Sequence, residues 1–187
     1  MDRKAEIVSL AEELIQKGGY GGFSYSDLSK ALGIAKASIH HHFPSKEDLG
    51  LAVLRSLDER TGQVVRQIDS GDRSSWQKLD WYLDYGRGMV DKGEGLICPV
   101  NALQIDIDVI PETMRQALGA VEQRELDFLT GVLDLGRQRG EMSFQGPARE
   151  RAMMMLAAFK GALQFARDHG AQFFYTVIDQ LKATLRS

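Results

Sequence analysis

Apolar residues recur every three or four positions along most of the chain, which is the pattern of amphipathic helices. Between residues 2 and 17, for example, they fall at Ile7, Leu10, Leu14 and Ile15. No stretch of useful length alternates as a half-buried strand would, and the sequence holds no internal repeat. The pattern predicts an all-α fold of about nine helices, over approximately residues 2–17, 25–32, 35–42, 46–68, 75–91, 98–106, 111–139, 148–168 and 172–186.

Polar residues mark the ends of the helices near the N-terminus. Ser24 with Asp27, and Ser45 with Asp48, have the spacing of residues that cap the start of a helix. Gly33 supplies a C-terminal stop, so a short helix, a tight turn and a second short helix follow one another. This order is the outline of a helix-turn-helix. Breaks are also expected at residues 70–74 and 93–95, which are rich in glycine, serine and charge.

The helix over residues 35–42 has two different faces. Ile39 and Phe43 lie about 40° apart on a helical wheel and are its large apolar residues, so they are expected to face the core. The opposite face carries small or hydrogen-bonding side chains, with basic ones on its flanks: Ala37, Ser38 and His41, then Lys36, His40 and His42. Such a face can enter the major groove of DNA. In the preceding helix, Leu28, Ala31 and Leu32 are expected to face inward.

Charge supports this reading locally rather than globally. The net charge is −3, which by itself does not suggest binding to nucleic acid. From Leu28 to Lys46, however, the chain carries three lysines, three histidines and no acidic residue. Consecutive histidines on a helix point about 100° apart, so they cannot ligate one metal ion together. No metal site, cofactor or catalytic motif is expected.

Composition limits where the chain acts. No apolar run approaches the roughly 18 to 20 residues that span a bilayer. The N-terminal stretch is charged and amphipathic, unlike a signal peptide. A single cysteine, Cys98, excludes an internal disulfide and fits a reducing compartment. We therefore expect a cytoplasmic protein without a membrane partner.

The segment FSYSDLSKALGIAKASIHHHFPSKEDLGLAVL resembles the DNA-binding motif of the TetR family of bacterial transcriptional regulators. The similarity extends over roughly residues 5 to 54. It implies a helix-turn-helix domain over residues 1–47 whose third helix reads DNA. It also implies an all-helical domain over residues 48–187 that binds a small-molecule effector and forms a homodimer through its last two helices.

The resemblance also assigns roles to residues. Lys46 and His42 would contact phosphates, and Ala37 and Ser38 would lie at the groove. Together with the outward face, the candidate DNA contacts are Ser26, Lys36, Ala37, Ser38, His40, His41, His42 and Lys46. The chain departs from the family at two positions. His40 replaces a usual tyrosine, and Ala35 replaces a serine or threonine cap, at a cost of about 1 kcal/mol.

Candidates in the remaining two-thirds of the chain are less specific. The candidate effector-binding residues are Trp81, Tyr85, Met89, Cys98 and Met154. For Trp81 and Tyr85, core packing is the expectation and a ligand site is the alternative. Cys98 is either an inert packed thiol or a sensor of reactive compounds, as in the branch of the family that CPVNALQIDIDVIPETMRQAL resembles. The candidate dimer interface combines small residues of one helix with apolar residues of the last: Ala157, Gly161, Phe174, Val177, Ile178 and Leu181.

The favoured hypothesis is a repressor that binds a near-palindromic operator as a homodimer and is released by a small molecule. Two alternatives stay open from the residues alone. One is a helical enzyme with its site in the C-terminal domain, which would lose turnover on mutation of a polar residue there. The other is a protein-binding adaptor, whose affinity for DNA would not change in a Lys46→Ala variant.

Overall fold

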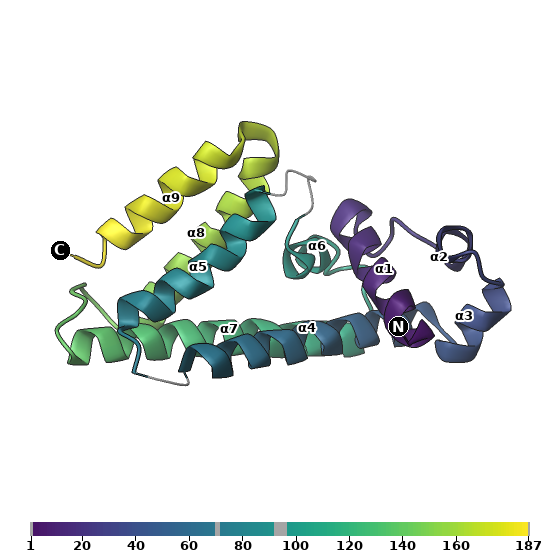
Figure 1. Ribbon diagram of the computed structural model, residues 1–187, viewed down its shortest axis with the longest axis horizontal. Coiled ribbons are helices and arrows are strands. Elements are labelled where there is room, and N and C mark those ends of the chain that lie inside the picture. The colour runs from purple at the N-terminus through teal and green to yellow at the C-terminus, as the bar shows by residue number, and fades with distance from the viewer. Residues whose placement is uncertain (1, 70–71, 92–96, 187) are drawn as a thin grey trace. The chain divides into compact units, whose positions relative to one another are not determined.

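The computed structural model describes residues 2–69, 72–91 and 97–186. Within these residues the regular elements are helices, so the all-α prediction is confirmed (Figure 1). Their bounds are α1 Arg3–Gly18, α2 Tyr25–Leu32, α3 Lys36–His42, α4 Lys46–Asp69, α5 Ser75–Asp91, α6 Pro99–Ile105, α7 Glu112–Gln138, α8 Ala148–His169 and α9 Ala171–Ala183. The expected break at 93–95, and the start of the one at 70–74, lie outside the described residues.

The chain forms two compact units. The first comprises Met1–Arg60 and Ile97–Val121, and the second comprises Thr61–Leu96 and Glu122–Ser187. Helices α4 and α7 each contribute to both units, and α6 belongs to the first. These structural units divide the chain differently from a boundary at residue 47, which remains a prediction about function.

The first unit has a core that joins α1 to the helix-turn-helix and to α6. Ile7, Ile15, Leu28 and Leu103 are fully buried there. Burying a side chain of this size stabilises a fold by about 1.5–3 kcal/mol. None of the described helices is long and apolar enough to span a membrane.

The helix ends form largely as the sequence predicts. Ser24 and Asp27 make a reciprocal capping box at α2, with the Ser24 N–H donating to Asp27 at 2.8 Å. Ser45 and Asp48 repeat it at α4, where the Asp48 N–H donates to the Ser45 hydroxyl at 3.0 Å. Ala35, the N-cap residue of α3, makes no side-chain cap, because the side chain of alanine has no hydrogen-bonding group. The predicted caps are confirmed.

The core of the second unit is aromatic. The ring centroids of Tyr82 and Phe159 are 5.0 Å apart, and those of Phe159 and Phe174 are 5.8 Å apart. Phe159 and Phe174 come from α8 and α9, which lie against each other and against α5 (Figure 1). Next to Phe159, Lys160 of α8 forms a nearly buried ion pair with Glu125 of α7 at 2.8 Å. The three helices α5, α8 and α9 therefore enclose one apolar core.

Candidate DNA-binding surface

The two faces of α3 differ as the sequence predicts. Ile39 is fully buried and Phe43 is 2% exposed. The side chains expected to face outward, and the basic residues flanking them, are exposed or half-buried: Lys36, Ala37, Ser38, His40, His41 and His42. In α2 the expectation for Ala31 is wrong, because that residue is exposed. Tyr25, three residues before Leu28, lies on the buried face of α2 and is 6% exposed.

Tyr25 fastens α2 to the junction between α3 and α4. Its hydroxyl lies 2.9 Å from the Phe43 carbonyl oxygen and 2.5 Å from the Ser45 carbonyl oxygen, so it donates one proton between two acceptors. Burial, assisted by the charge of Asp48, raises the pKa of Tyr25 to about 12. Sequence reasoning missed this residue, although its spacing of three from the buried Leu28 places both side chains on one face of α2.

The histidines occupy separate positions, as their spacing requires. The His40 ring stacks at a tilt on Tyr25, with centroids 4.7 Å apart, and its Nδ1 lies 3.3 Å from the Pro44 carbonyl oxygen. The His41 and His42 rings meet edge to face, 5.6 Å apart. Tyr25 therefore orients His40, while the other two histidines stand beside each other at the end of α3.

A shallow hollow lies over the outward face of α3. Its lining residues come from α1, from the turn and from α3: Arg3, Ile34, Ala37, Ser38, His41 and His42. Arg3 is a candidate that the sequence prediction left out. A basic residue in the first turn of α1 was the available signal, but only the fold places it beside α3. Arg3 also pairs with Glu6 at 2.5 Å.

Lys46 begins α4 at the edge of this region. Its ammonium lies 4.2 Å from the centroid of the Phe23 ring and 4.8 Å from that of Tyr20. It donates a hydrogen bond to the Phe23 carbonyl at 2.5 Å. Burial lowers the pKa of Lys46, against the opposing charges of Asp106 and Asp27. Ser26, the remaining candidate contact, is exposed on α2.

Comparisons with known proteins agree with this geometry. The family model described as "Bacterial regulatory proteins, tetR family" matches residues 7–53. A TetR-family transcriptional regulator from Agrobacterium tumefaciens has a crystal structure that matches with a TM-score of 0.92, at 32% identity and over 97% of both chains. The chain belongs to the TetR family.

Curated relatives of this TetR-family protein are also regulators. A helix-turn-helix transcriptional regulator from the lacX 3' region of Lactococcus lactis is 30% identical, over 70% of this chain and 71% of its own length. The transcriptional repressor NemR of Escherichia coli is 24% identical, over 86% of this chain and 82% of its own length. The chain is thus a DNA-binding transcriptional regulator with a helix-turn-helix, and its relatives are regulators rather than enzymes.

The effector candidates of this TetR-family chain fall in both compact units. Cys98 is buried at the start of α6 in the first unit, and the others lie in the second. Trp81 is 42% exposed and Tyr85 is 53% exposed, so the expectation that they pack in the core is wrong. Met154 is exposed as well and Met89 is half-buried. Exposed side chains enclose no ligand within a single chain, so these candidates stay a prediction.

The predicted dimer interface divides into two sets. Phe174, Ile178 and Leu181 are buried within the chain, so they offer no surface to a second copy, and this part of the prediction is wrong. They fill the contact between α9 and its neighbours α5 and α8. Ala157 is exposed, and Gly161 and Val177 are half-buried. Those three remain available to a partner.

Other apolar side chains do reach the surface of α8 and α9. Phe165 is 55% exposed and Phe173 is 36% exposed, and their ring centroids are 5.5 Å apart. The His169 ring stacks on Phe173 at 5.4 Å. Met153 and Met154 are exposed on the same helix, α8. Neighbouring exposed aromatic side chains such as Phe165 and Phe173 are typical of interaction surfaces.

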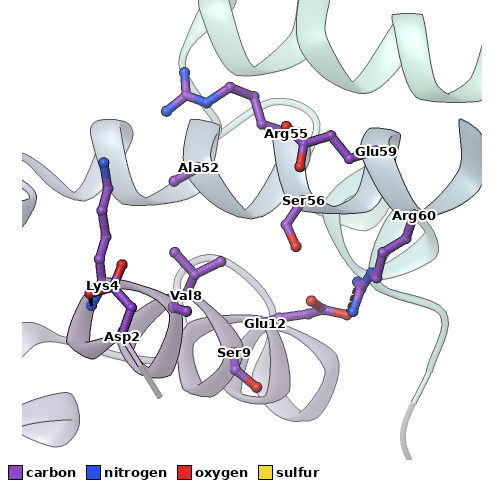
Figure 2. Close-up of a pocket in the computed structure, with 11 residues that line it drawn as sticks. Asp2, Lys4, Val8, Ser9, Glu12, Ala52, Arg55, Ser56, Glu59 and Arg60 are labelled. Atoms are coloured by element: carbon purple, nitrogen blue, oxygen red, sulfur yellow. Dashed lines mark hydrogen bonds and ion pairs between the residues drawn. The ribbon is translucent and has the colours of Figure 1, made fainter. Parts of the chain in front are cut away.

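A second groove, between α1 and α4, carries mixed charge (Figure 2). Acids and bases alternate along it, and Glu12 of α1 pairs with Arg60 of α4 at 2.6 Å. Lys4 and Asp2 sit at one end, with Arg55 and Glu59 on the opposite wall. Charges of both signs give no uniform field for a phosphate or a cation. Over the described ranges, no three histidine, cysteine or acidic residues gather as metal ligands would.

Proposed function

We propose that the chain acts in the cytoplasm as a homodimeric repressor, which binds a near-palindromic operator and is released by a small-molecule effector. The outward face of α3 carries the proposal. Ala37, Ser38 and His41 are small or hydrogen-bonding and exposed, while Ile39 and Phe43 fix the helix to the core. An anchored helix with such a face fits the major groove.

The contacts divide by their position around α3. Ser38 and His41 can reach base edges, because they occupy the centre of the outward face. Basic and polar side chains around that centre would contact phosphates on either side of the groove: Arg3, Ser26, Lys36, His40, His42 and Lys46. Phosphate contacts set the position and the salt dependence of binding, and base contacts set its sequence preference.

A second copy of the chain is the proposed partner of the exposed apolar face on α8 and α9. A two-fold interface buries the same patch on both copies. Phe165, Phe173 and Ala157 would contribute to it, with Gly161 and Val177 beside them. The two α3 helices of such a dimer read half-sites about 34 Å apart, or a multiple of that distance.

Regulation follows from a difference in affinity. A small molecule can release the operator only if it binds more tightly to a dimer whose α3 helices do not match the half-sites. The relatives include repressors and other transcriptional regulators, and the repressor NemR supports the direction proposed here. A reporter gene under the flanking promoter should rise in expression when this chain is deleted. A fall would instead identify an activator.

The direct test is DNase footprinting on the intergenic DNA next to the gene, followed by affinity measurements at several salt concentrations. Lys46→Ala should weaken binding to all sequences and reduce the salt slope by about 0.9 for each copy. Lys182→Ala, which removes the same charge from α9, is the matched control and should leave the slope unchanged. Equal slopes for the wild-type protein and Lys46→Ala would refute the phosphate contact. Absence of any protected site would refute the operator.

A further inference from the structure

Lys46 is held by the loop that follows α1. Its Nζ donates to the Phe23 carbonyl and lies over the rings of Tyr20 and Phe23. An ammonium has three protons, so this arrangement leaves donors for an external acceptor. A free lysine side chain loses much conformational entropy when it binds, and these contacts remove part of that loss beforehand. The loop therefore determines where this charge is placed.

The loop is in turn held by Asp106, the residue at the C-terminal end of α6. The Tyr20 backbone N–H donates to the Asp106 carboxylate at 2.5 Å. Gly19 permits this approach, because it has a φ of 76° and a methyl group there would collide with the same carboxylate. A second bond joins the same elements, since the Gln16 side-chain amide donates to the Ile97 carbonyl at 2.9 Å. The C-terminal end of α1 and the residues after it are thus attached to the residues that flank α6.

The ring of Tyr20 also rests on α4. A Cβ added to Gly50, one turn after Lys46, would lie only 3.2 Å from the Tyr20 Cε2. Burial and the charge of Glu47 raise the pKa of Tyr20. Beside it, the hydroxyl of Thr113 donates to Glu47. The Tyr20 ring therefore lies against the first turns of α4, beside Lys46.

We propose that Asp106 is a positioning residue for DNA binding: by accepting the Tyr20 N–H, it holds the ring against which Lys46 is aligned toward phosphate. Asp106 itself touches no DNA. It acts through Tyr20, whose backbone N–H it accepts and whose ring contacts Lys46. The inference rests on the proposed role of Lys46 as a phosphate contact.

Two matched pairs of variants test the two links. Asp106→Ala removes the acceptor, whereas Asp106→Asn keeps an acceptor oxygen of the same size without the charge. Tyr20→Ala removes the ring under Lys46, whereas Tyr20→Phe keeps it. We expect both alanine variants to weaken operator binding by about threefold to tenfold and to reduce the salt slope toward that of Lys46→Ala. The asparagine and phenylalanine variants should remain close to the wild-type protein.

The double variant of Asp106→Ala and Lys46→Ala shows whether Asp106 acts through Lys46. If it does, adding Asp106→Ala to Lys46→Ala should cause no further loss of affinity, because the group it positions is already absent. Equal losses in both backgrounds, an unchanged salt slope, or an Asp106→Asn variant as weak as Asp106→Ala would each overturn the proposal. Thermal unfolding of every variant identifies any that is unfolded under the assay conditions.

Failure of this inference is distinguishable from failure of the proposed function. If Lys46→Ala alone leaves affinity and salt slope unchanged, Lys46 does not contact phosphate, and both ideas fall together. If Lys46→Ala weakens binding and Asp106→Ala does not, the phosphate contact stands and only the positioning role is refuted. Operator affinities of the wild-type protein, Lys46→Ala, Asp106→Ala and the double variant separate the two results.

Discussion

Replacing Tyr25 with phenylalanine removes one hydroxyl from the joint between α2, α3 and α4. The ring stays, so its contact with His40 and its buried area are kept. The carbonyl oxygens of Phe43 and Ser45 both lose the hydroxyl as a donor, but only that of Phe43 is expected to be left without a hydrogen bond. The Ser45 carbonyl still accepts the N–H of Leu49 at 3.3 Å.

The expected loss of stability follows from the one buried carbonyl oxygen that is left without a donor. A hydrogen bond contributes about 0.5–1.5 kcal/mol, and a buried acceptor left without a donor costs about 1–3 kcal/mol. With one acceptor affected, we expect Tyr25→Phe to lower the free energy of unfolding by about 1–2 kcal/mol. For a chain of this length the melting temperature should fall by roughly 2–8 °C.

Urea titrations at neutral and alkaline pH give two independent readouts. The native state holds the Tyr25 proton more tightly than the unfolded state, because its pKa is raised from 10.0 to about 12. This contribution is complete below pH 10 and is lost as the pH rises through 12. Phenylalanine does not titrate, so the stability difference between the two proteins should narrow over that interval.

A matched control is Tyr85→Phe, which removes a hydroxyl from an exposed ring on α5. Its effect should stay within about 0.5 kcal/mol. If Tyr25→Phe is as mild as this control, the hydroxyl does not hold the joint. A stability difference that stays constant from neutral pH to pH 12 would contradict the titration argument.

Four further predictions concern the caps and the second unit. Hydrogen bonds from Ser24 and Ser45 lower the pKa of Asp27 and of Asp48. The two carboxylates therefore stabilise the fold above the ordinary pKa of 3.8, and this stabilisation is lost as the pH falls through the lowered pKa. Asp27→Asn and Asp48→Asn should each make the free energy of unfolding depend less steeply on pH in the acid range. Ala35→Ser should raise the free energy of unfolding by about 0.5–1 kcal/mol in urea, because it supplies the absent cap of α3. Phe174→Ala should cost about 3–5 kcal/mol in the same assay. Phe173→Ala should instead raise the dimer dissociation constant, measured by sedimentation, by roughly tenfold or more.

Each of these has an outcome that contradicts it. Asp179→Asn removes a carboxylate from an exposed position on α9 and serves as the control for the acid limb, which it should not alter. An Ala35→Ser variant no more stable than the wild-type protein would mean that a serine there makes no cap. If Phe173→Ala unfolds the chain as readily as Phe174→Ala, the exposed face is structural and not an interface.

Periodicity and turn residues predicted the helices because both are local properties. Ser24 with Asp27 and Ser45 with Asp48 act over three residues, so their caps could be located from spacing alone. The inward direction of Ile39 follows equally from a helical wheel. Local patterns of this kind also directed the assignment of the outward face of α3.

Contacts between distant segments could not be predicted in the same way. Asp106 lies 86 residues from Tyr20, and nothing in either local sequence signals their hydrogen bond. In α9 the helical period marks Phe174 as apolar but does not distinguish a neighbour in the same chain from a second copy. Its burial against α5 and α8 settles that choice in favour of the chain itself. The exposure of Trp81 could not be predicted from its spacing either, because aromatic residues occur both in cores and on interaction surfaces.

In α3, different residues anchor the helix and face outward, and this affects how the DNA sequence preference of such regulators can change in evolution. Ile39 and Phe43 hold the helix, while Ala37, Ser38 and His41 contribute almost nothing to the core. Substitutions at the three outer positions can therefore accumulate without weakening the fold. A duplicated gene could acquire a new target sequence through a few such changes while it keeps the same scaffold. Recognition in this helix can evolve at little risk to folding.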